Sequence, residues 1–153
     1  MAVAKLKLVE APDVEIEGGA PALIPEGEYR LRFDSWMTLV MFGRVPKVCL
    51  EFAVIDPGPY FEAHLRRWYN VSRLIGKPGR RGRFKAGWNS NLMREYVQVL
   101  GRNPRADRLA LSNYRQHIIV GRVATVTHTR EQSALPELLR YSVIRNLVGI
   151  EKP

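Results

Sequence analysis

The chain has 153 residues, 46% of them hydrophobic, which suits one globular domain with a sizeable hydrophobic core. Its formal net charge of +9 favours a polyanionic partner, either nucleic acid or an anionic membrane surface. No run approaches the ~18 apolar residues of a membrane-spanning helix, and the single cysteine, Cys49, excludes an intramolecular disulfide and a cysteine-based zinc cluster. The N-terminus lacks an apolar segment followed by a small-residue cleavage site, so we expect a cytoplasmic protein.

Residues 1–26 are acidic and interrupted by Pro, Gly and Ala, which predicts a flexible N-terminal arm ahead of a domain over 27–153. From Gly27, "GEYRLRFDSWMTL" alternates in the manner of a strand. The residues expected to face the core are Tyr29, Leu31, Phe33 and Met37. Those expected on the opposite face are Arg30, Arg32, Asp34 and Trp36.

Two further strands are predicted after Gly/Pro turns, "KVCLEFAVI" and "FEAHLRRWYNV". The first has a regular apolar face, made of Val48, Leu50, Phe52 and Val54. The second is less regular, because Arg67 shares a face with Leu65 and Tyr69. Its other face, predicted to point away from the core, carries His64, Arg66 and Trp68.

"NSNLMREYVQVLG" predicts a helix, because its apolar residues recur at i, i+4 spacing between capping residues and Gly101. "NPRADRLALSN" is then a connection, "YRQHIIVGRVATVTHT" a long strand with a bulge or bend at Gly121, and "LRYSVIRNLVGI" the last strand. Three strands, a helix and two strands are the element order of the OB-fold, a five-stranded Greek-key barrel. The sequence therefore predicts a mainly β, OB-fold-like domain, although other small barrels with one helix would share this pattern.

The segment from Arg73 to Trp88, "RLIGKPGRRGRFKAGW", is rich in basic residues and glycine and has no acid. Aromatic residues lie within and beside it, and no acid occurs between Ala63 and Arg94. Basic side chains follow phosphates and aromatic faces stack on bases, so we expect a flexible, nucleic-acid-binding flap rather than a solvated connection. The predicted nucleic-acid-binding residues are Arg30, Arg32, Trp36, Arg66, Trp68, Arg73, Lys77, Arg80, Arg81, Arg83, Phe84, Lys85 and Trp88.

The aromatic members of this set have alternative interpretations. A one-residue slip of strand register would move Trp36 and Trp68 into the core. Phe84 and Trp88 could instead anchor the basic segment against the start of the helix. The sequence leaves these alternatives open.

The segments "EGEYRLRF", "VCLEFAVI", "LMREYVQVLG" and "HIIVGRVATVTH", in this order, resemble OB-fold single-stranded-DNA-binding proteins of bacteriophages and mobile elements. The likeness runs from Pro25 to Ile150 and rests mainly on element order. It implies a protein that coats single-stranded DNA during replication or recombination. Such proteins commonly end in an acidic tip that recruits partner enzymes, whereas this chain ends "GIEKP" and carries its acidic stretch at the N-terminus.

No enzyme, catalytic site, metal site or cofactor is predicted. His64, His117 and His128 lack the spacing of metal ligands, and the acids are scattered, with only Asp34 and Glu51 placed to meet on neighbouring strands. The predicted partner is single-stranded DNA, with RNA as the alternative polymer and no membrane; a second copy of the chain and replication or recombination proteins are further candidates. The alternative function is a regulatory factor of a mobile element whose basic surface contacts an acidic protein.

Overall fold

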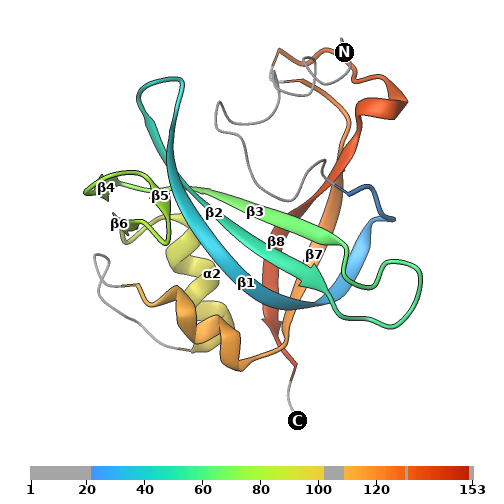
Figure 1. The fold of residues 1–153 in the computed structure, drawn as a ribbon, viewed down its shortest axis with the longest axis horizontal. Coiled ribbons are helices and arrows are strands. Elements are labelled where there is room, and N and C mark those ends of the chain that lie inside the picture. The colour runs from blue at the N-terminus through green and yellow to red at the C-terminus, as the bar shows by residue number, and fades with distance from the viewer. Residues whose placement is uncertain (1–21, 102–108, 130, 152–153) are drawn as a thin grey trace.

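The structure is a computed structural model that describes residues 22–101, 109–129 and 131–151, and it is built on an antiparallel β-sheet (Figure 1). The predicted mainly β class is therefore confirmed. The long strands are β1 (Gly27–Met41), β2 (Val45–Val54), β3 (His64–Asn70), β7 (Ile119–Val126) and β8 (Tyr141–Ile150). They are ordered β3-β2-β1-β7-β8 across the sheet.

The helical segments are α2 (Asn91–Leu100) and the short 3-10 helices η1 (Leu111–Gln116) and η2 (Glu137–Leu139). The predicted helix is confirmed as α2, with the expected caps: the Ser90 hydroxyl accepts from the Met93 N–H at 3.1 Å, and Gly101 is left-handed with φ 69°. No helix in the described part of the chain is long and apolar enough to cross a membrane.

Strand β1 is the central strand and pairs with a different neighbour at each end. Its first residues pair with β7 and its later residues with β2, and Leu31 pairs with both Ile119 and Val54. A strand shared in this way must bend, and β1 curves across the molecule (Figure 1). The register against β2 shifts between Phe33 and Ser35, which marks a β-bulge at Asp34.

This bulge corrects the predicted facing of β1. The expected alternation holds up to Phe33, but an extra residue at Asp34 reverses it beyond that point. Trp36 therefore lies opposite the core residue Leu50 and packs against the core, with its ring 6.3 Å from that of Phe33. Met37 lies opposite Cys49 on the other face.

The main core lies between the inner face of the sheet and the helices α2 and η1. The apolar face predicted for β2 is fully buried, as are Leu92 and Tyr96 of α2. Tyr114 of η1 joins the two layers, because its ring meets Tyr96 at 5.5 Å and Phe33 at 5.7 Å. Each such large side chain contributes roughly 1.5–3 kcal/mol when it is fully buried, so this layer dominates the stability of the domain.

Strand β7 is shorter than predicted, because the residues before it form η1. The bulge expected at Gly121 lies on the partner strand instead: where the register shifts between Val120 and Gly121, the residue left without a partner is Val148 of β8. A β-carbon at Gly121 would lie 2.6 Å from Leu31 Cδ1 of the neighbouring strand β1, so a larger residue would displace the buried Leu31 side chain.

The predicted N-terminal arm lies mostly outside the described residues. Its last part packs on β8: Ile24 is buried, its N–H donates to the Ser142 hydroxyl at 2.9 Å, and the Ser142 N–H donates to the Ala22 carbonyl at 2.8 Å. The described segment from residue 22 to 26 is therefore attached to the sheet.

The two edge strands of the sheet, β3 and β8, come close together beside α2. A carboxylate from α2 joins them. Glu95 Oε1 accepts from the Tyr69 hydroxyl of β3 at 2.8 Å and from the Leu147 N–H of β8 at 2.7 Å. Glu95 also pairs with Arg67 of β3, which explains why a charged residue lies on the apolar face of that strand.

Candidate nucleic-acid interface

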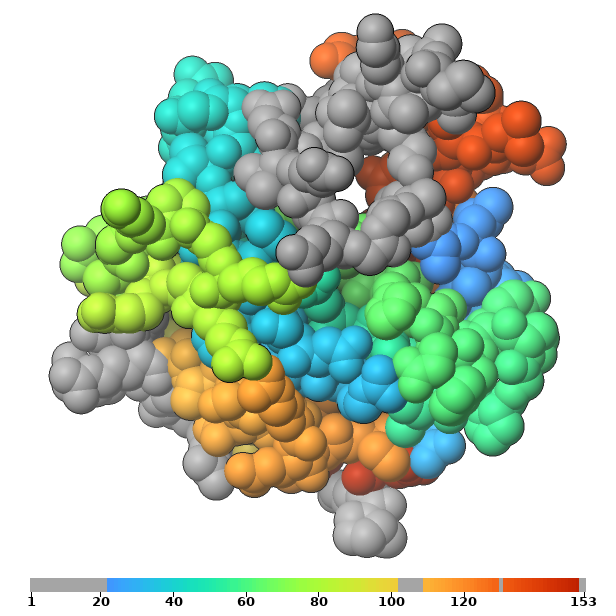
Figure 2. Space-filling view, viewed as in Figure 1, coloured from blue at the N-terminus to red at the C-terminus, as the bar shows by residue number. Residues whose placement is uncertain are grey.

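The basic segment forms three short strands, which we call the basic hairpin (residues 73–85). Strand β4 (Arg73–Ile75) pairs with β6 (Arg83–Lys85), and β5 (Gly79–Arg80) between them pairs with Met37 and Thr38 of β1. Figure 2 shows the hairpin, in yellow-green, at the left of the molecule. The expectation of a free flap is wrong in this respect, because strand pairing fixes the hairpin to the central strand.

Side-chain contacts reinforce this attachment. The Thr38 hydroxyl accepts from the Gly79 N–H at 3.1 Å, and Trp36 Nε1 donates to the Gly82 carbonyl at 3.0 Å. A β-carbon at Gly82 would lie 1.9 Å from Thr38 Oγ1, so the close approach requires glycine. The Phe84 side chain is 6% exposed and packs in the main core, which attaches β6 of the hairpin to the rest of the domain.

The hairpin presents cations to solvent. Arg73, Lys77, Arg81 and Arg83 are exposed, and none of them has an ion pair with any residue that the structure describes. Arg80 differs, because its Nη1 lies 3.4 Å from the Glu51 carboxylate. Exposed cations that are clustered in this way set up a positive potential that attracts phosphate.

The predicted binding residues on the first half of β1 have acidic partners instead. Arg32 donates to both Glu62 oxygens, at 2.8 and 2.9 Å, and to Asp34 at 2.9 Å. These hydrogen bonds raise the pKa of Arg32 and lower that of Glu62. Arg30 donates to Glu151 at 2.8 Å, which raises its pKa. Both guanidinium charges are therefore largely balanced, and they add less positive potential than the hairpin does.

Strand β3 carries Arg66 and Trp68 on the face away from the main core, as predicted. Trp68 is half-buried and packs against a second small apolar cluster that contains Leu39, Met41 and Cys49. It also lines a pocket of about 370 Å³ between β3 and the start of α2. The other lining residues are Lys47, Tyr69, Asn70, Asn89, Ser90, Asn91 and Arg94.

Besides Trp68, the residues that line this pocket carry amide, hydroxyl and cationic side chains. Amide groups can hydrogen-bond to the edge of a base, and cations can pair with phosphate. Trp88 lies two residues before the helix cap and is 57% exposed. Trp68 and Trp88 therefore remain candidates for stacking.

Two predicted contact residues pack inward. Trp36 is partly buried and packs on Phe33 against the main core, and Phe84 is a buried core residue. For Trp36 the reason is the bulge at Asp34. For Phe84 it is the alternation of β6, which turns Phe84 inward and its neighbours Arg83 and Lys85 outward.

Comparison with protein-family models, with curated proteins and with solved structures finds no match. Function must therefore be inferred from the geometry and charge of the interface. Within the residues that the structure describes, no three His, Cys, Asp or Glu side chains are grouped to hold a metal ion.

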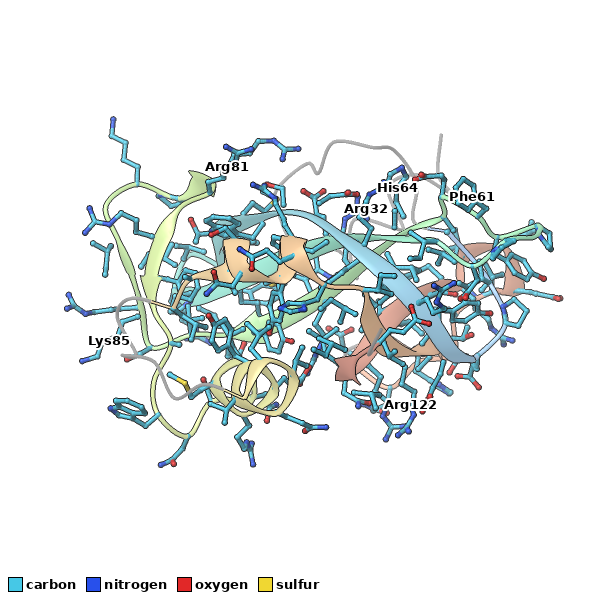
Figure 3. The ribbon with its side chains drawn as sticks, turned by 90° about the horizontal axis from the view of Figure 1, so that it is seen from below. Arg32, Phe61, His64, Arg81, Lys85 and Arg122 are labelled. Carbon is cyan, nitrogen blue, oxygen red and sulfur yellow. The ribbon has the colours of Figure 1, made fainter. Side chains whose placement is uncertain are left out.

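Sequence reasoning missed aromatic residues in two turns. Phe42 is 41% exposed at the tip of the β1–β2 turn, where it adopts a φ of 54°. Phe61, 54% exposed in the β2–β3 connection, projects on the same side as Arg32, His64 and Arg81 (Figure 3). The signal was an aromatic residue within two positions of glycine or proline, in "MFGR" and "GPYFE", where burial is not expected.

Proposed function

We propose that the protein binds single-stranded DNA with little sequence preference, through the basic hairpin and the tryptophans beside it. It is a binding protein and not an enzyme in this proposal. The observation that carries it is a group of exposed cations on a hairpin that is fixed to the sheet. These cations are Arg73, Lys77, Arg81 and Arg83, which form no ion pair with the described residues.

The two kinds of side chain at the interface match the two parts of a single strand. Lys and Arg neutralise phosphates, and each phosphate neutralised on a single strand contributes about −0.7 to the log–log dependence of affinity on salt. Tryptophan faces stack on unpaired bases, worth roughly 1–3 kcal/mol for each base. A duplex keeps its bases stacked internally, so the aromatic contribution favours single strands.

We further propose that the domain is an OB-fold-like barrel. Three features support this assignment: the strand order β3-β2-β1-β7-β8, the position of α2 between the third and fourth long strands, and the approach of β3 to β8. Together with the sequence resemblance to single-stranded-DNA-binding proteins, the assignment favours a role in the replication or recombination of phage or mobile-element DNA.

A panel of polymers tests the proposal. Affinity for oligo-dT, duplex DNA, oligo-U and heparin is measured by fluorescence anisotropy between low and moderate salt. We expect micromolar or tighter binding of oligo-dT at low salt, weaker binding of duplex, and a salt slope on the order of −2 to −4. Tighter binding of oligo-U would favour the RNA alternative. A folded protein that binds no polymer at low salt would contradict the proposal and favour an acidic protein partner.

A further inference from the structure

One exposed cation of the basic hairpin has an unusual backbone conformation. Arg81 has a φ of 53°, in the left-handed region that residues with a β-carbon seldom adopt. It occupies the third position of a four-residue turn, which the Gly82 N–H closes on the Gly79 carbonyl at 3.1 Å. Turns with positive φ at this position favour glycine or asparagine, so arginine is less stable here than glycine would be.

Strand β1 holds this strained residue from both sides. The Arg81 N–H donates to the Trp36 carbonyl at 2.9 Å, and the Trp36 indole N–H donates to the carbonyl of Gly82 at 3.0 Å. Trp36 is itself fixed by its packing on Phe33 in the main core. The backbone on each side of the Arg81 Cα is therefore hydrogen-bonded to Trp36 of the central strand.

The Arg81 side chain is exposed while its backbone is held. It forms no ion pair with any described residue, and it projects from the hairpin away from the sheet (Figure 3). A guanidinium group offers a planar fork of donors that matches the oxygens of a phosphate. A backbone fixed in advance lowers the entropy that is lost when such a contact forms.

We propose that Arg81 is a preorganised contact for a backbone phosphate of single-stranded DNA and that Trp36 is its positioning residue. This inference rests on the proposed function and assigns one part of the interface within it. It also gives Trp36 a role other than the predicted stacking on a base, because its indole N–H hydrogen-bonds to the hairpin backbone.

The substitution Arg81→Gly separates folding from binding. Glycine relieves the positive φ, so we expect an unchanged or higher melting temperature. Removal of the guanidinium should weaken oligo-dT binding about tenfold and make the salt slope about 0.7 less negative. The control is Arg122→Gln, which removes one charge on the opposite side of the molecule (Figure 3) and should change affinity less than twofold. A lower melting temperature for Arg81→Gly, or a loss of affinity no greater than that of the control, would overturn the assignment.

A double-mutant cycle tests the positioning role. Trp36→Phe keeps a ring in the core but removes the hydrogen bond to Gly82, so affinity should fall severalfold while the salt slope stays unchanged. In the Arg81→Gly background, Trp36→Phe should have little further effect, because both changes act on one contact. Equal losses in the two backgrounds would show that Trp36 acts independently of Arg81. If Trp36→Phe is unstable, the Arg81→Gly result alone decides whether Arg81 is a contact.

Inorganic polyphosphate is the second probe, because it offers phosphates without bases. If the wild type binds polyphosphate but not oligo-dT, the proposed function fails, and the same variants then test the Arg81 contact with polyphosphate. If the wild type binds both probes and Arg81→Gly weakens neither, only the Arg81 assignment fails. If the wild type binds neither probe, both proposals are contradicted.

Discussion

Arg67 and Glu95 form a buried, two-pronged ion pair between β3 and α2. Arg67 Nε lies 3.1 Å from Glu95 Oε1, and its Nη2 also donates to the second carboxylate oxygen. Burial is the largest single influence on the pKa of Arg67 and would lower it. The hydrogen bonds and charge interactions with Glu95 and Tyr69 together outweigh burial, so that the pKa is raised and the guanidinium stays charged. Because the same carboxylate accepts from Tyr69 and Leu147, the pair connects both edge strands of the sheet to α2.

Glu95→Gln should therefore be strongly destabilising. It leaves the buried Arg67 charge without its counter-charge, a change that typically costs about 3–5 kcal/mol of unfolding free energy. Chemical denaturation followed by circular dichroism measures the loss. The matched control is Glu62→Gln at the exposed pair with Arg32, which should leave stability nearly unchanged. Similar stabilities for the two variants would contradict a structural role for Glu95.

Two buried tyrosines should respond in opposite ways to loss of the hydroxyl. The Tyr69 hydroxyl donates to Glu95, so Tyr69→Phe should cost about 1.5–3 kcal/mol, as for a hydrogen bond to a charged group. The Tyr114 hydroxyl is buried without a hydrogen-bond partner among the described residues. Tyr114→Phe should therefore leave the unfolding free energy unchanged or raise it by up to about 1 kcal/mol. A large loss for Tyr114→Phe would indicate an unseen partner for that hydroxyl.

The same tyrosines predict alkaline sensitivity. Burial, followed by the negative charge of Glu95, raises the pKa of both Tyr69 and Tyr114. A raised pKa favours the neutral phenol in the folded state, so this stability is complete below pH ~10 and is lost as the pH rises further. In a titration to high pH, the absorbance of tyrosinate should show that a fraction of the tyrosines ionises only at the pH where the circular dichroism signal of the folded protein is lost. Full ionisation of all tyrosines in a folded protein would contradict the prediction.

Removing exposed cations from the basic hairpin should weaken binding and spare stability. Arg73→Ala combined with Arg83→Ala removes two exposed charges, which contribute little to folding. Affinity for oligo-dT should fall, and the salt slope should become less negative by about 0.7 for each phosphate that is no longer neutralised. The charge-matched control is Arg122→Gln combined with Arg145→Gln on β7 and β8. Equal affinities for the two double variants would mean that only net charge matters.

Of the two candidate stacking residues, Trp88 can be replaced with less effect on folding, because its side chain is largely exposed. Trp88→Ala should leave the melting temperature unchanged and weaken oligo-dT binding about tenfold, the equivalent of stacking on one base. Binding of heparin, which has no bases, should not change. Leu138→Ala is the control for loss of an exposed apolar side chain. Leu138 is 91% exposed, is aliphatic and so cannot stack as an aromatic ring does, and is far from the basic hairpin in sequence. An equal loss for heparin and oligo-dT would exclude stacking by Trp88.

Much of the fold could be predicted from local patterns. The apolar face of β2 and the capped helix α2 each follow from a short stretch of sequence. Which side chains of β1 face the core beyond Phe33 could not be predicted, because no residue in "RFDSW" indicates the bulge at Asp34. One inserted residue there turns Trp36 toward the core, where it is partly buried.

The buried ion pair was visible only as two separate irregularities. Arg67 interrupts the apolar face of β3, and Glu95 lies on the apolar stripe of α2 between Leu92 and Val99. Each polar residue alone weakens the pattern of its element. Only the tertiary structure brings the two together and shows that they satisfy each other. The acidic partners of Arg30 and Arg32 are likewise distant in sequence, so their charge balance could not be read locally.

The central claim, that single-stranded DNA binds at the basic hairpin and the adjacent tryptophans, is tested most directly by a nuclear magnetic resonance titration with oligo-dT. The chain has three tryptophans, so three indole N–H signals report on the interface. We expect the indole signals of Trp68 and Trp88 and the backbone amides of residues 73–85 to shift or broaden together, while the amide of Arg122 stays unchanged. Shifts confined to β7 and β8, with the hairpin amides and both indoles unaffected, would contradict the claim.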